Sequence, residues 1–271
     1  MSLSKIELVP DINLDLDIDI NLELLCNDFS KKNTISKTEK KIDIKHELLI
    51  ILSSSFEKCV KGYHIINDDP IKETPWEDIN VQILNASGCN ITSQSNGSHK
   101  PGADLYCSIG ELSNKSTQYD SGKKSFKLSS YRLTTVCSDK VPGDIDNIIL
   151  EINKRKNFKY YSIIVRDEKD TNIIYDWYLI PSEHPAVNPS TYKWNQKMGK
   201  IGKNKNSVIG WETNKVEGSS MSISFSMSSQ LWMTINITDE IKKFKICSCK
   251  VNKGRIYNYI EIYDKYCLMK K

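Results

Sequence analysis

Apolar residues recur at the spacing of an α-helix in two segments of the chain. Between Ile44 and Ile66 they occupy positions 48, 49, 52, 56, 59, 60 and 63, which places them on one face of a helix. Residues Ile145–Arg155 show a shorter run of the same kind. We therefore predict a long helix in the first segment and a short helix in the second.

Three other segments alternate between apolar and polar residues, which is the pattern of a half-buried β-strand. The longest alternation, "DINLDLDIDINLELL" at Asp11–Leu25, predicts an edge strand or an extended arm laid against a partner. Residues Phe158–Pro181 form two β-rich runs around the turn residues "DEKD", so they predict a hairpin. Residues Ser219–Ile237 alternate again and predict further strands near the C-terminus.

The segments between these elements give weaker signals. Residues Asn67–Ile79 contain two prolines and are expected to form a loop, while Ile79–Leu84 predicts a short strand or a helical turn. The mixed propensities of Ser125–Cys137 favour a helix. The glycine-containing run Thr191–Trp211 is expected to be loop-like. This order of helices and strands predicts an α/β or α+β fold with a mixed central β-sheet flanked by helices.

Residues Ser98–Tyr119 predict a hairpin that carries charged side chains on one face. If its turn is centred between Ile109 and Gly110, Asp104 lies directly opposite Lys115, with Cβ atoms about 5 Å apart. Because strands alternate with period two, the apolar residues between the charged ones point into a core. The charged face then carries Asp104, Tyr106, Glu111, Ser113 and Lys115.

Length and composition are those of a globular protein with a substantial core. The chain has 271 residues, and its 39% hydrophobic and 27% charged residues are ordinary for that class. It contains no run of eighteen apolar residues and no signal-peptide pattern at the N-terminus, so we expect a soluble cytoplasmic protein without a membrane partner. Eight scattered cysteines without a C-x-x-C pair predict reduced thiols rather than disulfides or a zinc site.

Charge is distributed unevenly along the chain. The net charge is +4, but residues 1–30 hold one lysine and seven acids, which leaves −6 there and +10 on the remainder. A basic body with an acidic arm is typical of a protein that binds a polyanion. We accordingly divide the chain into an acidic N-terminal arm with a linker, residues 1–40, and a main domain, residues 41–271.

An aspartate and a lysine on one face of a hairpin, with another carboxylate nearby, suit the hydrolysis of phosphodiester bonds. A Mg²⁺ ion binds one or two carboxylates, lowers the pKa of a bound water and neutralises charge on the phosphate. A neighbouring lysine orients or deprotonates that water, or stabilises the developing oxyanion. The alternative is a surface salt bridge between Asp104 and Lys115, worth about 0–1 kcal/mol, and spacing alone favours that alternative.

The run "KPGADLYCSIGELSNKS" resembles the core of the PD-(D/E)xK nuclease superfamily, and in particular type II restriction endonucleases. Asp104, which follows Pro101 and Gly102, matches the first metal-binding acid of that motif, and Lys115 matches its lysine. The resemblance covers residues 45–240, mostly at the level of pattern. It implies a restriction-endonuclease-like core with extra C-terminal strands, a Mg²⁺ cofactor and a double-stranded DNA substrate.

The match to this motif is incomplete two residues before the lysine, where Ser113 stands in place of an aspartate or glutamate. Restriction enzymes with a small residue there take the missing carboxylate from elsewhere, commonly from a helix. Under this resemblance Glu57, in the predicted helix, is the best donor, and Glu111 is its rival. The resemblance thus implies a catalytic group of Asp104, Lys115, Glu57, Glu111 and Ser113, with Asp104, Glu57 and Glu111 as metal ligands.

Lysines and amides gather in "YKWNQKMGKIGKNKNSVIGW", which has no acid between Thr191 and Trp211. Lysines supply phosphate contacts that are independent of sequence, and asparagine side chains read adenine edges in the major groove. The alternatives are a solvated lysine-rich loop and, for Arg132, a structural ion pair. The predicted DNA-binding residues are Lys127, Arg132, Lys193, Asn195, Lys197, Lys200, Lys203, Asn204 and Lys205.

Together these features predict a type II restriction endonuclease that cuts duplex DNA at a short specific site. Such an enzyme is expected to be a homodimer, because two-fold symmetry matches a palindromic site, and Asp11–Leu25 is a candidate for the dimer contact. A DNA-repair nuclease of the same superfamily is a close alternative that differs only in its substrate. A non-enzymatic β-rich binding or structural protein, such as a phage or surface component, would suit the serine-rich strands of Ser219–Ile237.

Overall fold

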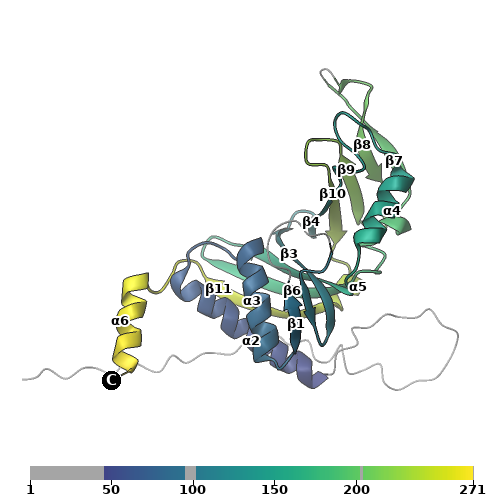
Figure 1. Cartoon of the computed structure of the whole chain (residues 1–271). Coiled ribbons are helices and arrows are strands. Elements are labelled where there is room, and N and C mark those ends of the chain that lie inside the picture. The colour runs from purple at the N-terminus through teal and green to yellow at the C-terminus, as the bar shows by residue number, and fades with distance from the viewer. Residues whose placement is uncertain (1–45, 95–101, 202–203, 271) are drawn as a thin grey trace, which may run out of the picture. The chain divides into compact units, whose positions relative to one another are not determined.

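One mixed β-sheet organises the chain in the computed structural model, which describes residues 46–94, 102–201 and 204–270. The acidic arm lies outside these residues, so the predictions made for it concern a part that the structure does not describe. Lys203 also lies outside them. All described residues belong to a single unit, residues 38–271. In the described part, eleven strands form the sheet and five α-helices flank it, which confirms the predicted mixed α+β architecture (Figure 1).

Both predicted helices are present, and three more accompany them. Apolar residues spaced by four, Leu52, Phe56 and Val60, form the buried face of the first helix. No helix in the described ranges is long and apolar enough to cross a membrane. The helices are α2 (His46–Ile66), α3 (Glu73–Ala86), α4 (Ile145–Arg155), α5 (Asp239–Lys242) and α6 (Tyr259–Met269), with a 3₁₀ turn η1 at Pro189–Thr191.

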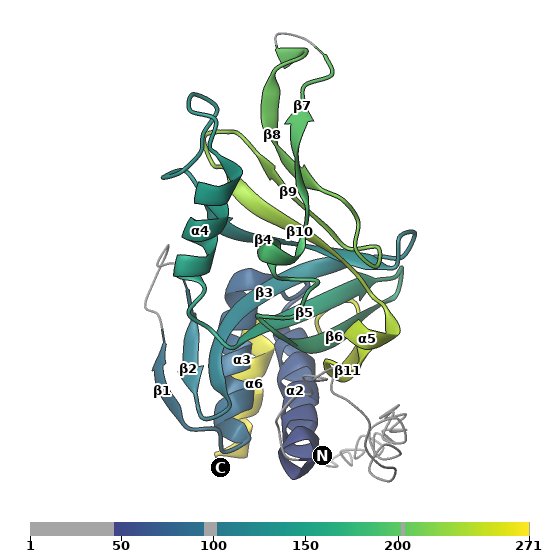
Figure 2. The same cartoon turned by 90° about the vertical axis from the view of Figure 1, so that its right-hand side faces the viewer.

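The strands follow the order β11-β6-β5-β3-β4-β10-β9-β8-β7, with β2 paired to β3 and β1 paired to β2 (Figure 2). Strands β3 and β5 are parallel, and the chain between them contains α4. Their bounds are β1 (Ile91–Gln94), β2 (Leu105–Cys107), β3 (Gly110–Asp120), β4 (Ser125–Arg132), β5 (Tyr160–Glu168), β6 (Asn172–Pro181), β7 (Trp194–Met198), β8 (Val208–Thr213), β9 (Ser220–Ser224), β10 (Gln230–Asn236) and β11 (Lys245–Asn252).

The strand predictions are confirmed in part. Strands β5 and β6 form the predicted hairpin, and β9 and β10 are the predicted C-terminal strands. The helix predicted over Ser125–Cys137 is wrong, because β4 pairs with β10 along its whole length. In β4, Phe126 and Leu128 point into a core while Lys127 between them is exposed. Pairing with a distant strand has overridden a weak local preference.

Two loop predictions are also wrong. The segment Asn67–Ile79 already contains the start of α3 at Glu73, because Pro75 lies in the first turn, where its missing N–H costs no helical hydrogen bond. The run Thr191–Trp211 is not simply a loop, since β7 and β8 pair within and beyond it as a hairpin. The lysines predicted to contact DNA are therefore presented partly by strands.

Two hydrophobic cores lie on opposite faces of the sheet. Strand β5 shows this directly, since its alternate residues belong to different cores. The first core lies under α2 and α3, where the Phe56 and Trp177 rings stack with centroids 5.8 Å apart. The second core lies under α4 and includes Phe126, Tyr161 and Met233. All seven cysteines in the described part are free thiols, in agreement with the sequence.

Candidate active site at the edge of strand β3

The hairpin formed by β2 and β3 sets the positions of the predicted catalytic residues. Its loop has only two residues, Ser108–Ile109, and β3 begins at Gly110 with a φ of 126°. The predicted register, with Asp104 opposite Lys115, is therefore wrong by two residues, and Ser113 occupies the position opposite Asp104. A shift of two residues leaves every side chain on its predicted face, because strands alternate with period two.

The Asp104 carboxylate is held at an unpaired edge of β3. Its Oδ2 accepts hydrogen bonds from the backbone N–H of Asn114 at 2.7 Å and from the Ser113 hydroxyl at 3.3 Å. Among the residues that the structure describes, 113–118 have no strand partner on this edge, since β2 pairs with residues 110–112 and β4 with residues 119–120. The carboxylate thus lies in the gap between β2 and β4.

Lys115 occupies the same gap. Its Nζ donates a hydrogen bond to the carbonyl of Asn114 at 2.7 Å. The same Nζ lies 3.9 Å from Asp104 Oδ2 and 3.9 Å from Glu73 Oε1. The Lys115 side chain is only 16% exposed, so its ammonium is held beside the carboxylates rather than free in solvent.

Helix α3 brings two glutamates to this group that the sequence analysis had not singled out. Glu73 and Glu77 are four residues apart, so both project from one side of the helix. Burial raises the pKa of Glu77, the carboxylates of Asp104 and Glu73 raise it further, and Lys115 lowers it. We call Asp104, Lys115, Glu73 and Glu77 the edge site.

Polar bonds in the first core fix α3 against the sheet. The indole N–H of Trp76 donates to the carbonyl of Ser162 in β5 at 3.1 Å. One turn later, Asn80 Nδ2 donates to Asn114 Oδ1 at 2.6 Å and to the Ser162 hydroxyl at 3.0 Å. Asn114 therefore bonds Asp104 through its backbone and α3 through its side chain, which couples the two halves of the edge site.

The sequence contains a signal for these two glutamates. Glu73 stands in the first turn of the helix, and Pro75 is at a position that favours a helix start. Trp76, Ile79 and Ile83 then follow at helical spacing and are buried. The two prolines of this segment predict a loop, in which its acids would have no fixed position. In the structure Glu73 and Glu77 belong to α3.

Of the two predicted donors of the second carboxylate, Glu57 lies away from the edge site, while Glu111 is on the same face of β3 as Ser113. Glu57 pairs with Lys61 at 2.6 Å on α2. Glu57 also lies near Cys249 of β11. Burial raises the pKa of the Cys249 thiol to about 12, and the Glu57 carboxylate contributes to that rise. Strand β11 is separated from β3 by β6 and β5, a distance of about 14 Å across the sheet. Glu111 is opposite Tyr106 near the hairpin loop and forms no ion pair within the described residues.

The residues of the edge site suit a hard cation, although no three His, Cys, Asp or Glu side chains in the described ranges meet as a metal-binding cluster. Mg²⁺ requires only one or two carboxylates, because it keeps several of its waters. Asp104 Oδ1 makes no hydrogen bond to the described part of the protein, and burial, followed by the Asp104 and Glu73 carboxylates, raises the pKa of Glu77. Asp104 and Glu77 are therefore the residues that would hold Mg²⁺, with Glu73 beside them.

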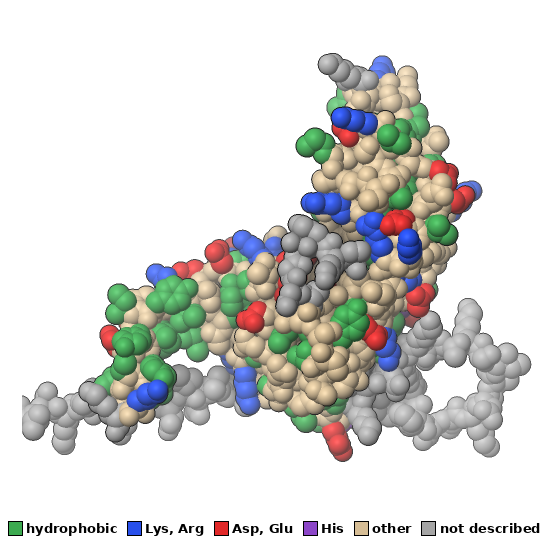
Figure 3. Space-filling view, viewed as in Figure 1, with side chains coloured by type: hydrophobic (Ala, Val, Ile, Leu, Met, Phe, Trp, Pro, Cys, Tyr) green, Lys and Arg blue, Asp and Glu red, His purple; other side chains and the backbone are tan. Residues whose placement is uncertain are grey.

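The predicted DNA-binding residues fall in two places. On β4, the Lys127 ammonium lies 4.6 Å from the Trp232 ring centroid, and Arg132 makes no ion pair within the described residues. In the upper part of Figure 3, which holds α4 and the strands β7–β10, basic and acidic side chains are interspersed. The remaining described residues lie on or beside the hairpin β7–β8, four strands from β4 at the end of the sheet: Lys193, Asn195, Lys197, Lys200, Asn204 and Lys205.

The chain was compared with protein families, curated proteins and solved structures. No protein-family model, no curated protein and no solved structure matches the chain. The inference about its chemistry therefore rests on the residues of the edge site and on the surfaces around it.

Proposed function

We propose that this protein is a Mg²⁺-dependent endonuclease that hydrolyses phosphodiester bonds of double-stranded DNA at a short specific sequence, as type II restriction enzymes do. The observation that carries the proposal is the convergence of Asp104 and Lys115 with Glu73 and Glu77 at the unpaired edge of β3. Carboxylates beside a lysine ammonium are the groups that metal-assisted phosphodiester hydrolysis uses.

Asp104, Glu77 and Lys115 of the edge site each have a role in this reaction. Mg²⁺ bound by Asp104 and Glu77 would supply a water of lowered pKa and a positive charge for the phosphate. The hydrogen bonds from Ser113 and Asn114 orient the Asp104 carboxylate toward that position. Lys115, whose ammonium is held beside Asp104, positions the attacking water or stabilises the oxyanion that develops on the phosphate.

In this proposal Ser113 is a positioning residue rather than a metal ligand. Its hydroxyl donates to Asp104, while the carboxylate that the motif places at this position comes instead from α3. A helix glutamate therefore still completes the group, and Glu77 takes the role that the sequence had suggested for Glu57 or Glu111.

The partners proposed are duplex DNA and a second copy of the chain, acting in the cytoplasm. The basic residues of β4 and of the hairpin β7–β8 supply candidate phosphate and base contacts. A homodimer fits a palindromic target, because two-fold symmetry of the protein then matches that of the DNA. A repair nuclease would use the same edge site on a different DNA substrate.

The direct test is incubation of the protein with plasmid and phage DNA in Mg²⁺ or in EDTA. Discrete fragments that form only with Mg²⁺ are expected. Asp104→Ala and Lys115→Ala should each abolish cutting while duplex binding, measured in EDTA, stays largely intact. Random degradation would favour a repair nuclease, and a protein that cuts no DNA under any condition would favour a non-enzymatic binding protein.

A further inference from the structure

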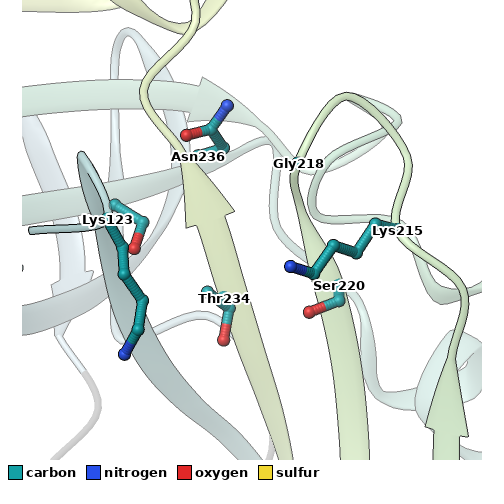
Figure 4. Close-up of a pocket in the computed structure, with 7 residues that line it drawn as sticks. Lys123, Lys215, Gly218, Ser220, Thr234 and Asn236 are labelled. Atoms are coloured by element: carbon teal, nitrogen blue, oxygen red, sulfur yellow. The ribbon is translucent and has the colours of Figure 1, made fainter.

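A pocket of about 310 Å³ lies on the face of β4, β10 and β9 that is turned away from the second core. The strand register builds it, because Thr234 lies opposite Ser220 and Asn236 lies opposite Ser125. No acidic side chain is among its lining residues, which are Lys123, Ser125, Lys215, Gly218, Ser220, Thr234 and Asn236 (Figure 4).

Hydroxyl groups from three neighbouring strands line this pocket. Ser125, Ser220 and Thr234 all line the pocket, and no side-chain hydrogen bond within the described residues involves their hydroxyls. The hydroxyls of Thr213 and Ser219 nearby are instead engaged, each by a backbone N–H. Three hydroxyl donors are therefore available to a ligand in the pocket.

Two lysines add positive charge from opposite sides of β10 (Figure 4). Lys123 pairs with Asp120 at 3.0 Å, but its side chain is 77% exposed, and such a pair is worth only about 0–1 kcal/mol. Lys215 forms no ion pair in the part of the chain that the structure describes. The lysines thus give the pocket a positive charge that a bound anion would neutralise.

The acid nearest to Lys215 in sequence is Glu217, which does not line the pocket. Burial raises the pKa of Tyr192 to about 12, and the Glu217 carboxylate contributes to that rise. Tyr192 belongs to the second core, and Glu217 itself is exposed. The next residue, Gly218, has a φ of 82° and no room for a Cβ beside the Asn236 amide, which fixes this wall of the pocket.

Strands β3 and β4 connect the pocket to the edge site. Lys127 lies on the same face of β4 as Ser125, and its carbonyl accepts a hydrogen bond from Thr117 at 2.6 Å. Thr117 follows Lys115 by two residues on β3. From Lys115 to the end of β3 at Asp120 the strand advances about 17 Å, which corresponds to about five base pairs of duplex rise.

We propose that this pocket binds a backbone phosphate of duplex DNA while the scissile phosphate occupies the edge site. Two ammonium groups, of which Lys123 is paired with the exposed Asp120, and three hydroxyls match the oxygens of a phosphodiester. Contacts of this kind carry no sequence information and fix the register of the duplex on the protein. The inference rests on the proposed function, because it assigns the pocket to the same substrate.

The test measures binding of a fluorescent duplex in EDTA over a series of KCl concentrations. Lys123→Gln/Lys215→Gln should lower the magnitude of the slope of log affinity against log salt by about 1, the value for one lost phosphate contact. Lys250→Gln/Lys253→Gln makes the same charge change at β11, the opposite end of the sheet, and should leave the slope unchanged. Lys123→Arg/Lys215→Arg should retain the wild-type slope.

The outcomes separate this inference from the proposed function. If the wild type cuts DNA but Lys123→Gln/Lys215→Gln leaves the slope unchanged, the pocket is not a phosphate site. The proposed nuclease function is then still supported. If the slope falls as expected in a protein that cuts no DNA, phosphate binding by the pocket is supported and the proposed nuclease function is contradicted. Equal losses in both Gln pairs would indicate a general charge effect and overturn the assignment, as would a wild type that binds no duplex.

Discussion

At the scale of single residues, the edge site depends on a buried asparagine that has no catalytic group of its own. Asn114 donates its backbone N–H to Asp104 and accepts a hydrogen bond from Asn80 of α3 through its side chain. Both asparagine side chains are almost fully buried, where an unmade hydrogen bond costs about 1–3 kcal/mol. The positions of Asp104 and Glu77 are therefore fixed by the same residue.

Glu77→Gln should lower Mg²⁺-dependent cleavage by at least about a hundredfold, because it removes a charged ligand for the cation. Asp78→Asn is the matched control, since Asp78 is the next residue of α3, is exposed and contacts Gln82 rather than the edge site. Cleavage rates at saturating duplex check the prediction. If Glu57→Gln or Glu111→Gln is as damaging as Glu77→Gln, the assignment of the helix glutamate is incorrect.

The pKa of Glu77 predicts a pH dependence of stability. Its folded-state pKa is raised above the ordinary value of 4.5, so the folded protein holds this proton more tightly than the unfolded chain. The resulting stabilisation is complete below pH 4.5 and is lost as the pH rises through the folded-state pKa. Glu77→Gln should abolish this contribution.

Urea denaturation at a series of pH values, without metal, provides the measurement. Above the folded-state pKa of Glu77 the Glu77→Gln variant should be more stable than the wild type, and the two should converge in acid. Added Mg²⁺ should stabilise the wild type at neutral pH and not the variant, because only the wild type offers the full ligand set. Parallel pH curves for the two proteins would contradict the prediction.

At the scale of elements, the sequence predicts the helices and strands whose apolar residues repeat with a regular local spacing. Helices α2 and α4 and the hairpin β5–β6 repeat their periodicity over many residues, so they could be recognised. Strand β4 could not, because its stability comes from pairing with β10, about a hundred residues later. Similarly, Asp104 and Lys115 were found from a local motif, whereas Glu77 reaches them only through packing of α3 on the sheet.

Gly110→Ala should lower the free energy of unfolding by about 1–2 kcal/mol, because a side chain at a φ of 126° is strained. Since β3 begins at this residue, the change should also reduce cleavage by displacing Asp104 relative to Lys115. Gly62→Ala is the control, because an added Cβ there meets nothing within 4 Å on α2 and should stabilise by about 0.5–1 kcal/mol. Equal stability of the two variants in urea would exclude this role for Gly110.

At the scale of the whole molecule, α6 stands out because none of its residues is buried. Its exposed side chains include Tyr259, Ile260 and Tyr263, and hydrophobic side chains gather over this helix in Figure 3. Removing residues 259–271 should therefore shift the thermal midpoint by less than about 2 °C, since little burial is lost. A larger drop, with a change in mass measured by light scattering, would mean that α6 packs against a second copy.

Strand β3 has one more consequence for the substrate. Its eleven residues run without interruption from the edge site to the turn that carries Lys123, and β5 supports it along seven of them. Because β5 pairs with most of this continuous strand, β3 sets the distance between the edge site and the pocket. If the two proposed sites hold the same duplex, a DNA whose phosphates do not match this spacing would have to bend or twist to contact both, and flexible pyrimidine–purine steps do so at lower energy. Base pairs that no side chain touches would then still influence where the DNA is cut.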